Sequence, residues 1–195
     1  MKGVIKLDNR KPIYLYNLLN SLSLAMDFSR IGLMNHHQRV ALLSLKIARA
    51  INIPDEKLQR LFCAAIIHDA GTSTWKEKAE LEVFEIGKPW DHCERGFKLI
   101  NSMNILSPVA HIILCHHDRW EGNNPSELAG RDIPVESRII HIADRIDILA
   151  GKTNNILNDR YDIINRIKGY ANIFLIPILY KLLRNWPIKK VFGLT

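Results

Sequence analysis

The chain has 195 residues, of which 47% are apolar and 24% charged, with 27 lysines and arginines against 20 aspartates and glutamates. This length and apolar content suffice for one globular domain with a buried core, and they exclude an intrinsically disordered chain and a protein built of membrane spans. The formal net charge of +7 is spread without a block of five like charges. A basic nucleic-acid-binding tail is therefore absent, and the charge fits a phosphate-bearing small ligand as well as RNA or DNA.

The cysteines and the late apolar stretch bear on the location of the protein. Three cysteines cannot all pair with one another, and no N-terminal segment has the pattern of a secretory signal. The stretch from Ile173 to Leu183 contains Pro177 and is shorter than the roughly 20 residues that cross a bilayer as a helix. We therefore expect a cytoplasmic protein without a membrane segment.

Glycines and prolines divide the chain into stretches of helical length, namely 12–32, 32–54, 54–71, 108–122, 134–151 and 151–169. Within them apolar residues recur at intervals of three and four, as Val40, Leu43 and Ile47 do, whereas the strand-like stretch Ile173 to Tyr180 is short. The pattern predicts an all-α, compact bundle of several helices. Three parts are expected: a helical segment over 1–35 packed on the core, a central domain over 36–150 and appended C-terminal helices over 151–195.

Several helix boundaries have a local cause. Pro54 followed by two carboxylates is typical of a first helical turn, and Gly71 predicts an end near His68. Pro108 predicts the start of a helix that runs into the pair His116 and His117. Pro134 likewise predicts the start of the helix that carries Asp144.

Several histidines and acids fall on the apolar faces of these predicted helices. His116 follows Ile112 by four residues and His117 follows Ile113 by four, so both imidazoles should face the core. The pair His68–Asp69, His92 and Asp144 extend this set. An ionised carboxylate in such a place costs several kcal/mol unless it is paired or binds a metal. Shared cations would satisfy the whole set, and its predominantly nitrogen and oxygen donors favour two ions of iron or manganese.

Other residues of the same types have simpler interpretations. A single histidine on an apolar face is more often a core side chain than a ligand, so His111 and His141 are interpreted as structural, with His141 as an outer partner of the site because it precedes Asp144 by three residues. Cys93 and Cys115 adjoin His92 and His116, and on a helix neighbouring side chains point about 100° apart. Both cysteines are therefore expected to be small core residues.

Five separated motifs occur in a recognisable order, and they read His36-His37-Gln38-Arg39-Val40-Ala41, His68-Asp69-Ala70-Gly71, His92 with Gly96, His116-His117-Asp118-Arg119-Trp120-Glu121-Gly122, and Arg138-Ile139 with Ala143-Asp144-Arg145-Ile146-Asp147. Over residues 36–150 the chain resembles the HD superfamily of metal-dependent phosphohydrolases. Within it, the chain resembles the HD-GYP branch, whose studied members hydrolyse cyclic di-GMP.

The resemblance implies a set of ligands and a reaction. The first ion would be held by His36, His68, Asp69 and Asp144, with His37 as the reserve for His36, and the second by His92, His116 and His117 with Asp69 as the bridge. A third ion, which some members bind through a Glu one turn earlier, is not expected because Gly32 stands there. Asp69 and His68 would be the catalytic residues around a hydroxide activated by two cations, and the resemblance thus implies a phosphodiesterase acting on cyclic di-GMP or a related dinucleotide.

The chain departs from the family pattern where substrate is recognised. Thr72 stands where the family usually has a lysine that helps with the phosphate, and Gly-Tyr-Pro is reduced to Asn123-Asn124-Pro125. Arg119 and Lys152 are the substrate-binding candidates. Lys76 is a further candidate to supply the positive charge of the lysine that Thr72 replaces.

Three rival functions remain open at this stage. The first is a catalytically weak or inactive signalling module that binds a nucleotide, a second copy or a partner protein through the C-terminal helices. The second is a di-iron oxygenase of the HD type, and the third, supported by charge alone, is binding to duplex nucleic acid.

Overall fold

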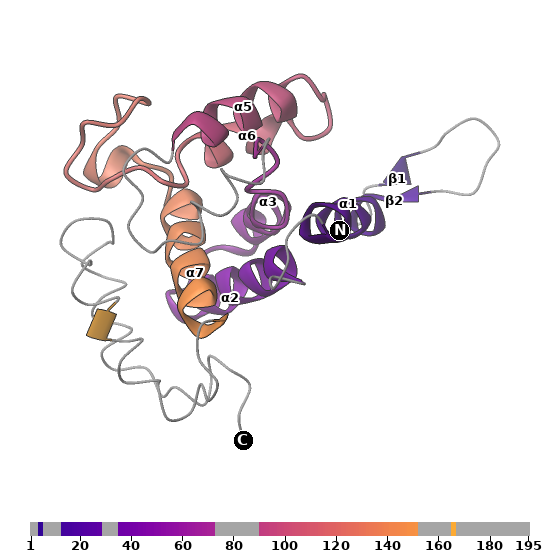
Figure 1. Cartoon of the computed structure of the whole chain (residues 1–195), viewed down its shortest axis with the longest axis horizontal. Coiled ribbons are helices and arrows are strands. Elements are labelled where there is room, and N and C mark those ends of the chain that lie inside the picture. The colour runs from indigo at the N-terminus through magenta and orange to yellow at the C-terminus, as the bar shows by residue number, and fades with distance from the viewer. Residues whose placement is uncertain (1–3, 6–12, 29–34, 73–89, 152–164, 167–195) are drawn as a thin grey trace.

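The computed structural model describes residues 4–5, 13–28, 35–72, 90–151 and 165–166, and Figure 1 gives the arrangement of their elements. In chain order these are β1 Val4–Ile5, β2 Ile13–Tyr14, α1 Leu15–Phe28, α2 His36–Ala50, α3 Asp55–Ala65, α5 Trp90–Asn101, α6 Ser107–Leu114, the 3₁₀ helix η1 Gly130–Asp132 and α7 Val135–Gly151. The predicted all-α fold is confirmed. The two short strands form one antiparallel ladder that pairs Val4 with Tyr14 and Ile5 with Ile13.

The helices pack around one apolar core. α2 packs against α3 and α7, and α6 packs against α3 and α5 (Figure 1). Large aliphatic side chains that are almost fully buried come from four of these helices, and they include Ile47, Leu61, Ile113 and Ile140. Burial of each such side chain contributes about 1.5–3 kcal/mol. The core therefore fixes the helices from which the candidate ligands project.

The predicted starts of α3 and α7 are confirmed. α3 begins at Asp55, directly after Pro54, and its first turn carries Asp55 and Glu56 where the positive end of the helix dipole favours carboxylates. α7 begins one residue after Pro134. In both cases proline supplies a backbone angle that suits a helix start without losing an intrahelical hydrogen bond.

The expected ends of two helices are wrong. α3 stops at Ala65, not at His68, and α6 stops at Leu114, before His116. Tighter turns follow in each case: the backbone N–H of Ile67 donates to Ala64, and that of Asp118 donates to Cys115. The chain thus leaves the regular helix just before each pair of candidate ligands.

None of the stretches of helical length expected from the sequence covers α5. Gly96, a residue type that weakens a helical pattern, lies in the middle of this helix. Of the earlier predictions, the helix over 151–169, the strand at 173–180 and the C-terminal extension fall largely or wholly outside the described residues. Among the residues that the structure describes, no helix has both the length and the apolar character required to cross a bilayer.

Candidate metal centre

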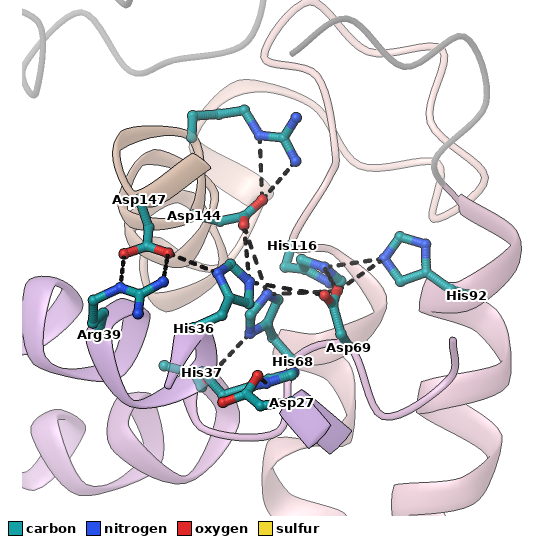
Figure 2. Close-up of polar contacts among 12 residues, drawn as sticks. Asp27, His36, His37, Arg39, His68, Asp69, His92, His116, Asp144 and Asp147 are labelled. Atoms are coloured by element: carbon teal, nitrogen blue, oxygen red, sulfur yellow. Dashed lines mark hydrogen bonds and ion pairs between the residues drawn. The ribbon is translucent and has the colours of Figure 1, made fainter. Parts of the chain in front are cut away.

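α2 presents two buried histidines at its first turn. His36 donates its Nδ1–H to Oδ2 of Asp147, which comes from α7, over 2.8 Å. Arg39 holds the same carboxylate through two bonds, from Nε to Oδ1 over 2.6 Å and from Nη2 to Oδ2 over 2.9 Å. Asp147 thus fixes the imidazole of His36 between two helices (Figure 2).

His68 and His116 are oriented by the turn that precedes each of them. Nδ1–H of His68 donates to the carbonyl oxygen of Ala65 over 2.8 Å, and Nδ1–H of His116 donates to that of Ile113 over 2.7 Å. The early end of the two helices is what brings these carbonyls within reach of the rings.

The partners of Nδ1 decide the tautomer of these imidazoles. Carbonyl and carboxylate oxygens only accept hydrogen bonds, so Nδ1 of His36, His68 and His116 carries the hydrogen. In the neutral ring Nε2 then keeps its lone pair, as in most histidines that bind metals. All three rings are therefore prepared to bind a cation through Nε2.

Asp69 joins the candidate ligands into two groups (Figure 2). In each group the ligand atoms lie within 4.8 Å of one another, and the groups are Asp69 with His92, His116 and His117, and Asp69 with His36 and His68. Oδ1 of Asp69 lies 3.5 Å from Nε2 of His68 and 3.5 Å from Nε2 of His92. Its Oδ2 lies 4.0 Å from Nε2 of His36.

Asp144 closes the first group from α7. Its Oδ1 lies 3.4 Å from Nε2 of His36 and 3.9 Å from Nε2 of His68. Its Oδ2 accepts a bond from Nη2 of Arg145 over 2.6 Å. Burial opposes ionisation of Asp144, but the charge of Arg145 and then the neighbouring histidines outweigh it and lower the pKa of this carboxyl. Asp144 therefore offers an ionised oxygen to the site.

The electrostatics and unmet hydrogen bonds of the first group fit a cation. Nε2 of His36 and Nε2 of His68 are buried and have no hydrogen-bond partner among the described residues. Burial lowers the pKa of His68 to about 3, so this imidazole is neutral at pH 7. Such lone pairs away from water are costly without a donor or an ion. The donor set consists of the nitrogens and oxygens that transition metals bind.

The seven residues expected to hold metal thus lie together, and each is at most 7% exposed: His36, His68, Asp69, His92, His116, His117 and Asp144. The substrate-binding candidates are placed differently. Arg119 follows the second histidine pair in a loop, and its guanidinium stacks on the ring of Trp90 at 4.9 Å. Lys152 and Lys76 lie outside the described residues.

Asn124 secures the loop that carries Arg119. Its Oδ1 accepts from the backbone N–H of Arg119 over 2.7 Å, and its Nδ2 donates to the carbonyls of Arg119 over 2.7 Å and Leu128 over 2.8 Å. The position that the resemblance assigns to a tyrosine is therefore occupied by a 7% exposed side chain that binds only backbone groups.

The prediction for His111 is wrong, and Cys93 has polar neighbours that the sequence did not predict. His111 is exposed and lies beside Phe97, with 5.9 Å between ring centres, so it is not a core side chain. Cys93 is buried as expected, but its Sγ lies 3.6 Å from Nε2 of His92 and 3.6 Å from Nδ1 of His116. Burial raises the pKa of this thiol, and the two imidazoles outweigh that effect and bring it to about 7.

Two other expectations hold. Cys115 is a buried, unpaired cysteine, and burial together with Asp118 raises the pKa of its thiol. His141 is buried beside the second group, with its ring centre 5.2 Å from that of His117.

Sequence reasoning missed the acids that orient the histidines. Asp147 carried a signal, because it follows Asp144 by three residues and so shares a face of α7. Asp27 of α1, whose Oδ1 lies 2.5 Å from Nδ1 of His37, carried none, because nothing in the spacing ties these two positions together.

Comparisons with known proteins agree with this geometry. The family model described as HD domain matches residues 22–163, which include all seven candidate ligands. The chain belongs to the HD domain family. HD-domain phosphohydrolases bind divalent metals, and the buried histidine and aspartate groups described above suit such ions.

Two curated relatives are phosphodiesterases by name. A cyclic di-GMP phosphodiesterase of Thermotoga maritima is 30% identical over 149 residues, which are 71% of this chain and 40% of the relative. A 3'3'-cGAMP-specific phosphodiesterase 1 of Vibrio cholerae is 29% identical over 126 residues, which are 64% of this chain and 29% of the relative. This HD-domain chain thus spans less than half the length of either relative.

A solved structure shares the fold. It is a cyclic GMP-AMP specific phosphodiesterase of V. cholerae, with a TM-score of 0.73 and 19% identity. The match covers 93% of this chain and 51% of the other.

Proposed function

We propose that this HD-domain chain is a phosphodiesterase that opens cyclic di-GMP or a related cyclic dinucleotide with the help of two divalent cations. The observation that carries the proposal is the position of Asp69, whose carboxylate faces histidines of both ligand groups at 3.5–4.0 Å. One bridging carboxylate between two sets of imidazoles suits a pair of ions and suits a single structural ion poorly.

The proposed ligands follow the two groups. The first ion would be held by His36, His68, Asp69 and Asp144, and the second by His92, His116 and His117 with Asp69 shared. The donors are imidazole nitrogens and carboxylate oxygens, which favours iron or manganese over the thiolate-rich sites typical of structural zinc.

A pair of divalent cations, when bound, supplies Lewis acidity toward phosphate oxygens and makes water a stronger nucleophile near neutral pH. The protein contributes position and charge. Asp69 and His68 belong to the part of the site where the two groups meet, and Arg145 keeps Asp144 ionised. Burial of all seven side chains separates the reacting phosphate from bulk water, which strengthens each electrostatic contact.

Substrate recognition would fall to the loop after His117. Arg119 lies two residues beyond this ligand and is the proposed phosphate contact, with Lys152 as a second. The names of the relatives support a cyclic dinucleotide as the substrate. The three cysteines are buried and form no disulfide, which is compatible with the proposed cytoplasmic location.

The proposal is tested by loading the protein anaerobically with Fe²⁺ or Mn²⁺, measuring bound metal by elemental analysis and following linear products of cyclic di-GMP and of cGAMP. We expect close to two ions per chain and turnover of at least one substrate. Asp69→Ala should lose both bound metal and turnover, since the bridging ligand is gone. An equal turnover by this variant, or none by the metal-loaded wild type, would contradict the proposal.

A second candidate function is supported by Thr72. Its hydroxyl oxygen is buried without a hydrogen-bond partner among the described residues, and no charge stands where the family usually has lysine. A signalling module that binds the dinucleotide without cutting it would fit this loss. Calorimetric binding of cyclic di-GMP by the metal-loaded protein, with no linear product, would favour this function.

A further inference from the structure

A third buried pair of histidine and aspartate lies beside the first ligand group and is not part of it. Nδ1 of His37 on α2 lies 2.5 Å from Oδ1 of Asp27 on α1. The two residues are 1% and 2% exposed. The contact is shielded from bulk solvent, and it joins α1 to the end of α2 that carries His36 (Figure 2).

The ring of His37 packs against both imidazoles of the first group. Ring centres lie 5.2 Å apart for His37 and His36, with an interplanar angle of 73°, and 5.1 Å apart for His37 and His68, with an angle of 49°. A change in the orientation of His37 would therefore displace one of the two rings that face Asp69 and Asp144.

The hydrogen-bonding state of His37 resembles that of His36. Asp27 accepts from Nδ1–H of His37, just as Asp147 accepts from Nδ1–H of His36. Nε2 of His37 then carries a lone pair, and it is buried without a partner among the described residues. A nitrogen in this state is satisfied by a donor such as a water molecule of the metal centre.

The structure assigns to Asp27 and His37 the role of a positioning pair for the first cation. Asp27 fixes the tautomer and plane of His37, and His37 holds His36 and His68 in place and offers Nε2 to the water of the centre. This inference rests on the metal centre of the proposed function and adds a statement about α1: the N-terminal helix is part of the metal-binding unit.

The experiment removes the pair without leaving a buried charge. Asp27→Leu combined with His37→Phe replaces both partners by apolar groups of similar shape, which is close to neutral for stability. Asp27→Asn alone keeps the shape and removes the charge. His111→Phe and Asp55→Asn make the same types of change at exposed positions outside the centre and serve as matched controls.

Each variant is titrated with Mn²⁺ without nucleotide, and the two dissociation constants are obtained from the paramagnetic resonance signal of free Mn²⁺. We expect the double variant to bind one Mn²⁺ about tenfold or more weakly, which is the effect of losing an outer partner of a ligand. The second constant should stay unchanged, and the weakened ion should be the one that Asp147→Asn also weakens. Asp27→Asn should show a smaller loss at the same ion, and both controls should match wild type.

Two results would overturn the inference: wild-type constants in both Asp27 variants, or an equal loss at both ions. If the double variant fails to fold in thermal melts, Asp27→Asn decides alone. The Mn²⁺ titration contains no nucleotide, so its dissociation constants do not depend on whether the protein hydrolyses phosphodiesters. If the wild type binds no Mn²⁺, the proposed metal centre itself is contradicted. This outcome differs from a failure of the inference, in which the wild type binds Mn²⁺ and the Asp27 variants bind it equally well.

Discussion

Asp147 shows how a residue outside the candidate ligand groups can orient a residue within them. It accepts the Nδ1–H of His36 and is held in turn by both nitrogens of Arg39 that face it. Burial raises the pKa of Asp147, and the bonds to His36 and Arg39 outweigh that effect and lower it. The carboxylate therefore stays ionised and keeps the lone pair of His36 on Nε2.

Asp147→Asn should weaken the binding of one cation about 10- to 100-fold, because the outer partner of His36 loses its charge. The protein should remain folded, since an amide of the same shape still accepts a hydrogen bond. Mn²⁺ titration measures the loss. Unchanged affinity for both ions would show that the charge of Asp147 is not needed to orient the imidazole of His36.

Asn124→Asp tests the loop that carries Arg119. The variant keeps the acceptor for the N–H of Arg119 and loses both donated bonds to backbone carbonyls. Metal content should match wild type, and the KM for the cyclic dinucleotide should rise severalfold because the loop is no longer fixed. A lower metal content would place the role of Asn124 in the metal centre instead.

Among the helices, the contact between the turn after α3 and α5 sets the distance between the two ligand groups. A Cβ added at Gly71 would overlap the carbonyl oxygen of His92 and the backbone nitrogen of Gly96. Only glycine permits this approach, and it brings the segment with Asp69 against the helix with His92.

Gly71→Ala should destabilise the fold by about 1–3 kcal/mol, because the methyl group meets backbone that cannot move aside. Gly96→Ala should cost less, since its Cβ would meet the end of the Ile113 side chain at 3.0 Å. Urea unfolding compares the two variants, and elemental analysis should find the larger metal loss in Gly71→Ala. Equal effects would mean that the two segments separate easily.

The fold class could be predicted because it depends on local patterns. Apolar spacing marked α2, α3 and α7, and the apolar spacing after Pro108 pointed to His116 and His117 as candidate ligands. His36 was expected as a ligand only from the resemblance to the HD superfamily. The orienting acid Asp27 could not be found, because it meets His37 only after α1 packs on the core. α5 was missed because Gly96 interrupts its helical pattern. The same glycine is required for the contact between α5 and the turn after α3.

For the whole molecule, the buried imidazoles make the stability of the metal-free protein depend on pH. Burial lowers the pKa of His68 and of His141 to about 3, from 6.5 in an exposed histidine. Between these values the unfolded chain binds protons that the folded chain does not, so stability falls as the pH drops from about 6.5 toward 3. Burial lowers the pKa of His36, but the hydrogen bond to Asp147 and the charge of Asp144 outweigh burial and raise it. His36 therefore stabilises the fold below pH 6.5, and this stabilisation is lost as the pH rises.

Chelator-treated protein should therefore lose thermal stability steadily from pH 6.5 downward, as followed by circular dichroism melts. Mn²⁺ at about 100 times its dissociation constant should add about 2.7 kcal/mol at pH 7, since it binds only the folded state. A metal-free protein whose melting temperature is flat over this pH range would contradict the neutral, buried state of these rings.

The acceptors of the Nδ1–H groups lie at very different distances along the chain. His68 and His116 use carbonyls three residues earlier, whereas His36 depends on a carboxylate 111 residues away. Gentle heating that loosens the contact between α2 and α7 would change the orientation of His36. The rings of His68 and His116 would keep their orientation, because their hydrogen-bond acceptors lie three residues earlier in the chain. Loss of the ions on warming should then be stepwise, with the ion nearest α7 released first.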